Sequence, residues 1–213
     1  MDVRAVVCIP WRKGRPDRVA AFEETFRTLW VPLGLPVYLG DSGHDRFHRA
    51  ASRNAAAYAA GDWDVAIFAD ADVLLDPANL REAVRQADIY DRVVLPHDRY
   101  QSLRKDGRPL QTSTAPTNGG ALVLSRQAWS RVQGYDERFA GWGYEDAAFR
   151  CATETLLGGP IRLPGYMREL YHEKTGRGRS ESERALYERY KRAWKNDDMG
   201  AMQALVDEDP LRV

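Results

Sequence analysis

The sequence predicts an α/β protein with a mostly parallel central sheet flanked by helices. Short apolar runs alternate with helical patterns in the first half of the chain, and this rhythm is typical of parallel strands joined by helices. The 213 residues are enough for one well-buried domain, and 44% of them are hydrophobic. The 31 basic and 31 acidic residues balance, so the chain lacks the basic excess typical of nucleic-acid-binding proteins.

The first half of the chain predicts three strands and three helices in alternation. The first strand ends at Pro10, Gly61 is a natural stop for the second helix, and Pro77 is a favourable first residue for the third. The strands are expected at 3–10, 35–40 and 63–69, and the helices at 17–30, 45–60 and 77–88.

The second half is less regular, with a polar stretch at 97–117 that predicts a long loop or a hairpin. Strands are expected at 92–95, 119–124 and 161–163, and helices at 126–132, 145–156 and 181–195. We expect one domain over residues 1–175, with the charged segment 176–213 forming a helical extension packed on that domain.

Location and assembly are indicated only by what the sequence lacks. No apolar run approaches the length of a membrane span, and the residues from Met1 to Arg4 lack the layout of a signal peptide. Cys8 and Cys151 are too few for a disulfide framework, which favours a reducing compartment. We therefore expect a cytoplasmic protein without a membrane span, and no feature of the sequence sets its oligomeric state.

The ends of the first three strands carry polar side chains, namely Arg12, Asp41, Asp70 and Asp72. Ligands of open α/β sheets bind beyond these strand ends, so the four side chains are expected at one crevice. Two aspartates one residue apart can offer one carboxylate to a divalent cation and the other to a sugar or ribose hydroxyl. The alternative is a solvated acidic turn before a proline-started helix, and the preceding apolar strand favours the functional interpretation.

The N-terminal half resembles the family-2-type glycosyltransferases through Arg49–Asn54, Gly61–Trp63 and Phe68–Asp72. Ile9–Arg12 is similar to the Ile-Pro-Phe-Arg opening of the β-1,4-galactosyltransferases, although Gly14 stands where that family has a second arginine. The resemblance implies the GT-A fold and a nucleotide-sugar donor. The donor-contacting residues that it implies are Pro10, Arg12, Asp41, Arg53 and Asp70.

The segment Gly141–Asp146 (GWGYED) resembles the Gly-Trp-Gly-Gly-Glu-Asp motif of the β-1,4-galactosyltransferases. Asn118–Ala121 is similar to a Gly-Gly strand that lies beside the donor sugar in that family. The resemblance implies that Asp146 is the catalytic base, with Glu145 beside it as a second catalytic residue. It also implies donor contacts for Gly119, Gly120 and Trp142, whereas Ala147 replaces an acid of that family and leaves the acceptor undefined.

His172 follows the last predicted strand, where similar enzymes have a metal ligand. The resemblance implies that Asp72 and His172 hold Mn²⁺ or Mg²⁺, and it offers Glu169 as a weaker third candidate. An imidazole suits manganese, which accepts both oxygen and nitrogen ligands. A surface or core histidine is the alternative. The glycine-rich basic segment 174–179 is either a lid over the donor diphosphate or an exposed connector.

These features together predict a metal-dependent glycosyltransferase, a hexosyl- or N-acetylhexosaminyltransferase that uses a UDP-sugar. The predicted acceptor is a hydroxyl of a protein, a glycan or a modified nucleobase, and the predicted stereochemical outcome is inversion with Asp146 as base. Two alternatives remain open. One is a nucleotidyltransferase of similar fold, and the other is a non-catalytic protein that binds a glycan or a nucleotide-sugar.

Overall fold

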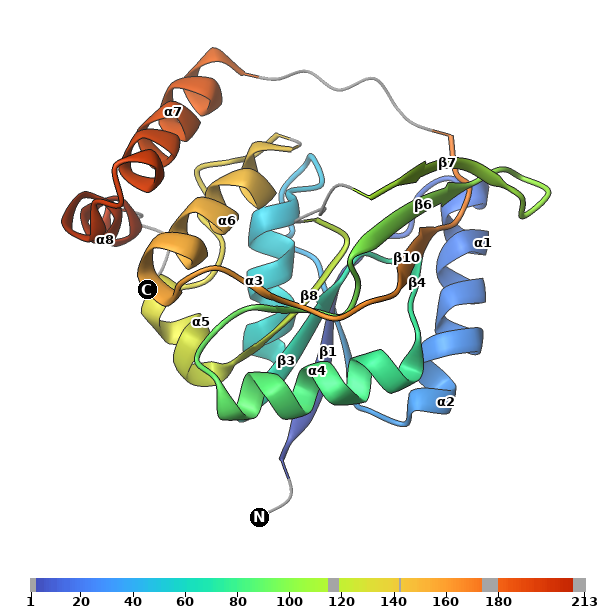
Figure 1. The fold of residues 1–213 in the computed structure, drawn as a ribbon. Coiled ribbons are helices and arrows are strands. Elements are labelled where there is room, and N and C mark those ends of the chain that lie inside the picture. The colour runs from blue at the N-terminus through green and yellow to red at the C-terminus, as the bar shows by residue number, and fades with distance from the viewer. Residues whose placement is uncertain (1–2, 115–118, 142, 174–179, 209–213) are drawn as a thin grey trace.

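The computed structural model describes residues 3–114, 119–141, 143–173 and 180–208 of the chain (Figure 1). Its strands are β1 (Ala5–Pro10), β2 (Val37–Gly40), β3 (Val65–Ala69), β4 (Val73–Leu74), β5 (Val94–Leu95), β6 (Arg99–Leu103), β7 (Pro109–Ser113), β8 (Ala121–Ser125), β9 (Ile161–Arg162) and β10 (Tyr166–Glu169). Its helices are α1 (Pro16–Thr25), the π-helical segment η1 (Phe26–Trp30), α2 (Val31–Leu33), α3 (Arg49–Ala59), α4 (Pro77–Ile89), α5 (Arg126–Val132), α6 (Tyr144–Leu157), α7 (Glu181–Lys195) and α8 (Met199–Asp207).

The central sheet of the described residues has six strands in the order β2-β1-β3-β8-β5-β9. Pairing is parallel between β1 and β2, between β1 and β3, and between β5 and β9. Strand β8 runs antiparallel to both of its neighbours. The α/β prediction is confirmed, but the sheet is mixed rather than mostly parallel, because β8 lies antiparallel between β3 and β5.

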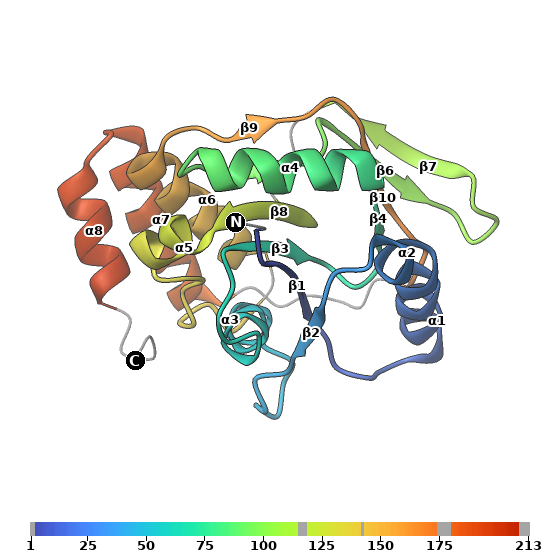
Figure 2. The same cartoon turned by 90° about the horizontal axis from the view of Figure 1, so that it is seen from below.

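The central sheet is buried on both faces, as the unbroken burial of β1 illustrates. Val6 and Cys8 belong to a core cluster shared with α3, α5, α6, α7 and α8. Val7 and Ile9 face the other way, into a cluster shared with η1 and α4. Because side chains of a strand alternate between faces, these two clusters lie on opposite sides of the sheet. Figure 2 shows α4 and α3 on either side of the strands.

A second sheet, with strand order β4-β10-β6-β7, was not predicted from the sequence. The hairpin alternative for residues 97–117 is confirmed by the antiparallel pairing of β6 with β7. Strand β10 runs parallel to β6 and antiparallel to β4, and the Leu170 amide donates to the Asp72 carbonyl at 2.8 Å. Strands as short as β4 show no periodicity, so only the tertiary structure reveals that the chain after Asp72 lies beside the chain before His172.

The C-terminal helices α7 and α8 pack on α6 and complete the core of the described residues. Tyr190 and Met202 are both buried in this cluster, and the Tyr190 hydroxyl donates to Asp136 Oδ2 at 2.8 Å. Where the extension begins, near residue 175, stays a prediction. Among the described residues, none of the helices has the length and apolar character needed to cross a membrane.

Candidate active site

Arg53 of α3 is the centre of a buried charge cluster, and its side chain is 3% exposed. It donates to Asp70 Oδ1 and to Asp146 Oδ1, each at 2.8 Å, and its guanidinium lies 4.8 Å from the centre of the Tyr135 ring. Asp70 follows β3 and Asp146 lies in the first turn of α6. One arginine therefore joins the two acidic motifs that the sequence presents far apart.

The pKa values of the two aspartates move in opposite directions. Burial alone would raise the pKa of Asp70, but the charges of Arg53 and Arg49 hold that pKa below its usual value. Burial raises the pKa of Asp146, and repulsion from Asp70 adds to the effect although Arg53 opposes it. Asp146 is thus a stronger base than a free aspartate.

The helix that carries Arg53 is fixed at two points. Asn54 pairs with the backbone of Tyr135, accepting from its amide at 3.0 Å and donating to its carbonyl at 2.8 Å. A Cβ on Gly40 would lie 2.9 Å from the Ala56 Cβ, so only glycine allows α3 to approach β2 this closely. The helix begins later than predicted because His48 caps it, accepting from the Ala51 amide at 3.4 Å.

Glu145 lies beside Asp146 and is 1% exposed. Its Oε2 accepts from the Gly143 amide, and its Oε1 lies 3.9 Å from guanidinium nitrogens of Arg49 and Arg53. Burial, reinforced by the charge of Asp146, raises the pKa of Glu145 to about 7. Glu145 therefore supports the loop before α6 and shares the charge of the arginines.

A second cluster consists of Asp72, Glu169 and His172, whose ligand atoms all lie within 4.8 Å of one another. His172 Nε2 lies 2.8 Å from Asp72 Oδ2, and this contact raises the pKa of the imidazole. The hydroxyl of Tyr100, on β6, donates to Glu169 Oε2. Two carboxylates and one imidazole nitrogen are a donor set that suits Mn²⁺ and, less well, Mg²⁺.

The arm that carries His172 is tied to the start of α1. The Glu173 amide donates to Asp17 Oδ2 at 2.8 Å, and Arg15 pairs with the Glu173 carboxylate. This backbone contact, more than the exposed ion pair, holds the arm, because surface pairs contribute little.

Members of both clusters, Asp70 and Asp146 from the first and Asp72 and Glu169 from the second, line one cavity of about 170 Å³. Gly119 and Gly120 form part of its wall. A Cβ on Gly119 would lie 2.9 Å from Asp146 Oδ2, and Gly120 has a φ of +90° and accepts from the Asp70 amide at 2.7 Å. The lining residues are Arg49, Asp70, Asp72, Val73, Tyr100, Gly119, Gly120, Asp146, Met167 and Glu169.

The remaining predicted residues lie apart from this cavity or outside the described residues. Pro10 is the buried last residue of β1, and Arg12 just beyond it donates to Asp41 Oδ2 at 2.7 Å, but none of these three lines the cavity. Trp142 lies outside the described residues, as does segment 174–179 with its predicted lid.

Sequence reasoning missed Tyr100 as a wall of this site and gave Arg49 no role of its own. The sequence of residues 97–117 does not distinguish a loop from a hairpin, and only the pairing of β6 with β10 brings Tyr100 to Glu169. Arg49 could have been suspected, since it lies four residues before Arg53 and such a spacing places both on one face of a helix.

The fold is the GT-A fold of glycosyltransferases, because solved structures of such enzymes superpose on most of the chain. The catalytic domain of Drosophila beta1,4-galactosyltransferase 7 in complex with xylobiose has a TM-score of 0.60 at 17% identity, with 86% of this chain and 79% of that chain covered. A mutant of that enzyme with manganese, UDP-Gal and xylobiose has a TM-score of 0.57 at 17% identity, covering 84% of this chain and 78% of that one.

GalNAc-T7 with UDP, GalNAc and Mn²⁺ has a TM-score of 0.59 at 12% identity, and the match covers 97% of this chain and 55% of that one. A family model described as the N-terminal domain of galactosyltransferase matches residues 108–173. The predicted resemblance to GT-A glycosyltransferases of the galactosyltransferase type is confirmed. Curated protein sequences provide no match to the chain.

Proposed function

We propose that this protein is a metal-dependent glycosyltransferase that transfers a hexosyl or N-acetylhexosaminyl unit from a UDP-sugar to an acceptor hydroxyl. The observation that carries the proposal is the cluster of Asp72, Glu169 and His172, two of whose members, Asp72 and Glu169, line the same cavity as Asp146. Manganese in the solved complexes of both similar enzymes supports Mn²⁺ as the ion.

The proposed roles follow from position and charge. Asp72, Glu169 and His172 would hold the cation, which when bound would neutralise charge on the diphosphate leaving group. Asp146 takes the proton of the acceptor hydroxyl, whose oxygen attacks the anomeric carbon while the bond to the diphosphate breaks and UDP leaves. Attack from the face opposite the diphosphate inverts the configuration. Burial and Asp70 raise the pKa of Asp146, which strengthens it as a base.

Donor binding falls to the residues around these groups. Arg53 keeps Asp70 and Asp146 in place, and Asp70 faces the ribose or the sugar. The pair of Arg12 and Asp41 contacts the nucleotide, and Gly119 and Gly120 lie beside the donor sugar. Trp142, outside the described residues, stays a predicted donor contact. Gly119 lies so close to Asp146 that a side chain at position 119 would fill the space proposed for the sugar.

The test is release of UDP and formation of glycoside from UDP-galactose, UDP-glucose, UDP-GalNAc and UDP-GlcNAc with Mn²⁺, using xylobiose and other saccharides as acceptors. Asp146→Asn and Asp72→Asn should each lower transfer by about 100-fold or more. Asp88→Asn, an exposed exchange on α4, is the matched control and should leave transfer unchanged. Full transfer by a folded Asp146→Asn variant would refute the assigned base.

Two further measurements separate the alternatives. A nucleotidyltransferase would form a nucleotide-sugar from a nucleoside triphosphate and a sugar phosphate, and it would release pyrophosphate. A binding protein would be stabilised by UDP-sugar and Mn²⁺ without releasing UDP.

A further inference from the structure

Glu183, in the first turn of α7, lies against the loop that leads into α6. Its residue is 7% exposed, and its Oε1 accepts from the Gly141 amide. Its Oε2 accepts from the Ser180 amide at 3.4 Å, while Ser180 Oγ accepts from the Glu183 amide at 3.3 Å. The carboxylate thus completes a capping box and also serves a donor from a distant loop.

The contact with Gly141 goes beyond what a helix cap requires, because a capping box consists only of the reciprocal bonds between Ser180 and Glu183. The backbone of Gly141 is close enough that a Cβ there would lie 3.0 Å from Oε1 of Glu183. All three atoms nearest to that Cβ position belong to Glu183. The loop backbone is therefore seated directly on this carboxylate.

The other end of the loop is held by the acidic cluster. The Gly143 amide donates to Glu145 Oε2, and Glu145 Oε1 lies 3.9 Å from the Arg53 nitrogen that donates to Asp146. Contacts thus connect α7 to Gly141, and they connect Gly143, two positions further along the chain, to the groups assigned to proton transfer.

We propose that Glu183 is a positioning residue for sugar transfer, which fixes the backbone at Gly141 and thereby the start of α6, three positions further along the chain. The inference rests on the proposed function. It makes α7 a working part of the site, although α7 lies beyond residue 175, where the predicted glycosyltransferase domain ends. Small displacements of a catalytic group reduce the reaction rate strongly, since a misplacement of about 1 Å can lower the rate by about 100-fold.

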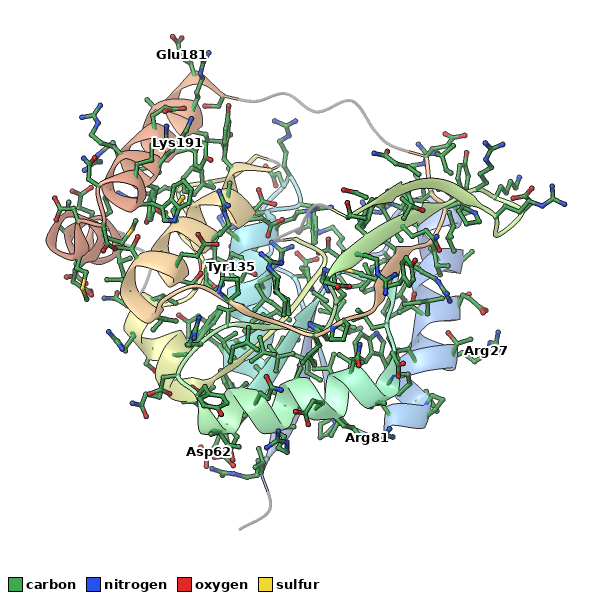
Figure 3. The ribbon with its side chains drawn as sticks, in the orientation of Figure 1. Arg27, Asp62, Arg81, Tyr135, Glu181 and Lys191 are labelled. Atoms are coloured by element: carbon green, nitrogen blue, oxygen red, sulfur yellow. The ribbon has the colours of Figure 1, made fainter. Side chains whose placement is uncertain are left out.

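The first experiment compares Glu183→Ala and Glu183→Gln with Glu181→Ala, an exposed acid in the same helical turn that serves as the matched control (Figure 3). We expect Glu183→Ala to lower kcat for transfer from UDP-galactose with Mn²⁺ by about tenfold or more, with a smaller change in the donor KM. Glu183→Gln keeps one oxygen for the Gly141 amide and should retain most of the rate. A lower Tm with unchanged kcat in Glu183→Ala would overturn the inference, because that is the behaviour of a helix cap alone.

A double-mutant cycle with Gly141→Ala gives a second, geometric test. The added methyl group meets Glu183 and should lower kcat in the wild-type background. In the Glu183→Ala background the methyl group has room, so the combined loss should be smaller than the product of the two single losses. Losses that multiply independently would overturn the inference.

Amide hydrogen exchange tests the same contact without catalysis. The Gly141 amide should be protected from exchange in the wild type and in Glu181→Ala. In Glu183→Ala its protection factor should fall by at least about tenfold. If the wild-type protein transferred no sugar, the proposed function would fail, while exchange at Gly141 and Asp146 would still decide whether Glu183 fixes the loop. Unchanged exchange at both amides in Glu183→Ala would overturn the inference whatever the activity. If Glu183→Ala does not fold, Gly141→Ala provides the comparison, because its added methyl group disturbs the same contact from the side of the loop.

Discussion

Arg53 donates a 2.8 Å hydrogen bond to Asp146, a residue 93 positions further along the chain. The same guanidinium binds Asp70, so the end of β3 and the start of α6 are joined by one buried cation. This pairing converts two acidic motifs into one site, and it allows buried carboxylates to be tolerated near each other.

Replacing Arg53 should destabilise the fold strongly. Arg53→Met keeps much of the volume but leaves Asp70 and Asp146 without their buried counter-charge, and Glu145 loses a nearby one. Removing one partner of a buried ion pair costs about 3–5 kcal/mol, so we expect a loss of that size in the free energy of unfolding measured with urea.

Arg81→Met is the control for Arg53→Met, because Arg81 is an exposed arginine of α4 (Figure 3). It should change the free energy of unfolding by less than about 0.5 kcal/mol. Equal stability of the two variants would contradict the role given to Arg53.

Glu145 should make stability depend on pH. Burial raises its pKa from 4.5 to about 7 in the folded protein, so the folded state binds its proton more tightly than the unfolded chain does. The stabilisation from this proton is complete below the unfolded pKa and is lost as the pH rises through 7.

Glu145→Gln removes that titration and should gain stability relative to the wild type between pH 5 and pH 8, by on the order of 3 kcal/mol. Urea unfolding at several pH values measures the difference, with Glu188→Gln on the exposed face of α7 as the control. If the difference in free energy of unfolding between the wild type and Glu145→Gln did not change across this range, Glu145 would not titrate there.

Manganese should bind the wild-type protein and stabilise it. Asp72→Asn and His172→Ala each remove one of the three ligands and should weaken Mn²⁺ binding by about tenfold or more in calorimetry. At a free Mn²⁺ concentration of about 100 times its Kd, chelation with EDTA should lower the free energy of unfolding by about 2.7 kcal/mol.

Asp88→Asn, the control, makes the same substitution at an exposed residue outside the cluster, and it should bind Mn²⁺ as the wild type does. Wild-type affinity in Asp72→Asn would place the ion elsewhere.

The C-terminal helices should unfold together with the central sheet. Tyr190 is buried and its hydroxyl donates to Asp136 Oδ2 at 2.8 Å, so Tyr190→Phe leaves that oxygen with one donor fewer. We expect a loss of about 1 kcal/mol and a single transition by circular dichroism and by fluorescence. Tyr90→Phe, at a tyrosine that is 50% exposed, is the control. Two separate transitions would mean that α7 and α8 are an independent unit.

The sequence by itself determined the elements whose signals are local. The apolar run before Asp70, the proline that opens α4 and the glycine-rich approach to α6 set the alternation of strands and helices. It also indicated candidate site residues: Asp72 because it follows a buried strand, where ligands of such sheets bind, and Asp146 and His172 through the resemblance to known glycosyltransferases.

Only the tertiary structure decided which of these groups meet and how each is charged. Segments far apart in the chain meet in the antiparallel pairing of β8 with β3 and in the short pairing of β4 with β10. They also meet in the contacts of Glu169 and Glu183. Burial and the charge of Asp70 raise the pKa of Asp146, whereas the charges of Arg53 and Arg49 hold the pKa of Asp70 below its usual value, although both residues are aspartates at element ends. Hydrophobic periodicity reports the local backbone, whereas desolvation and charge pairing depend on what packing brings within a few ångströms, and that is a property of the folded chain alone.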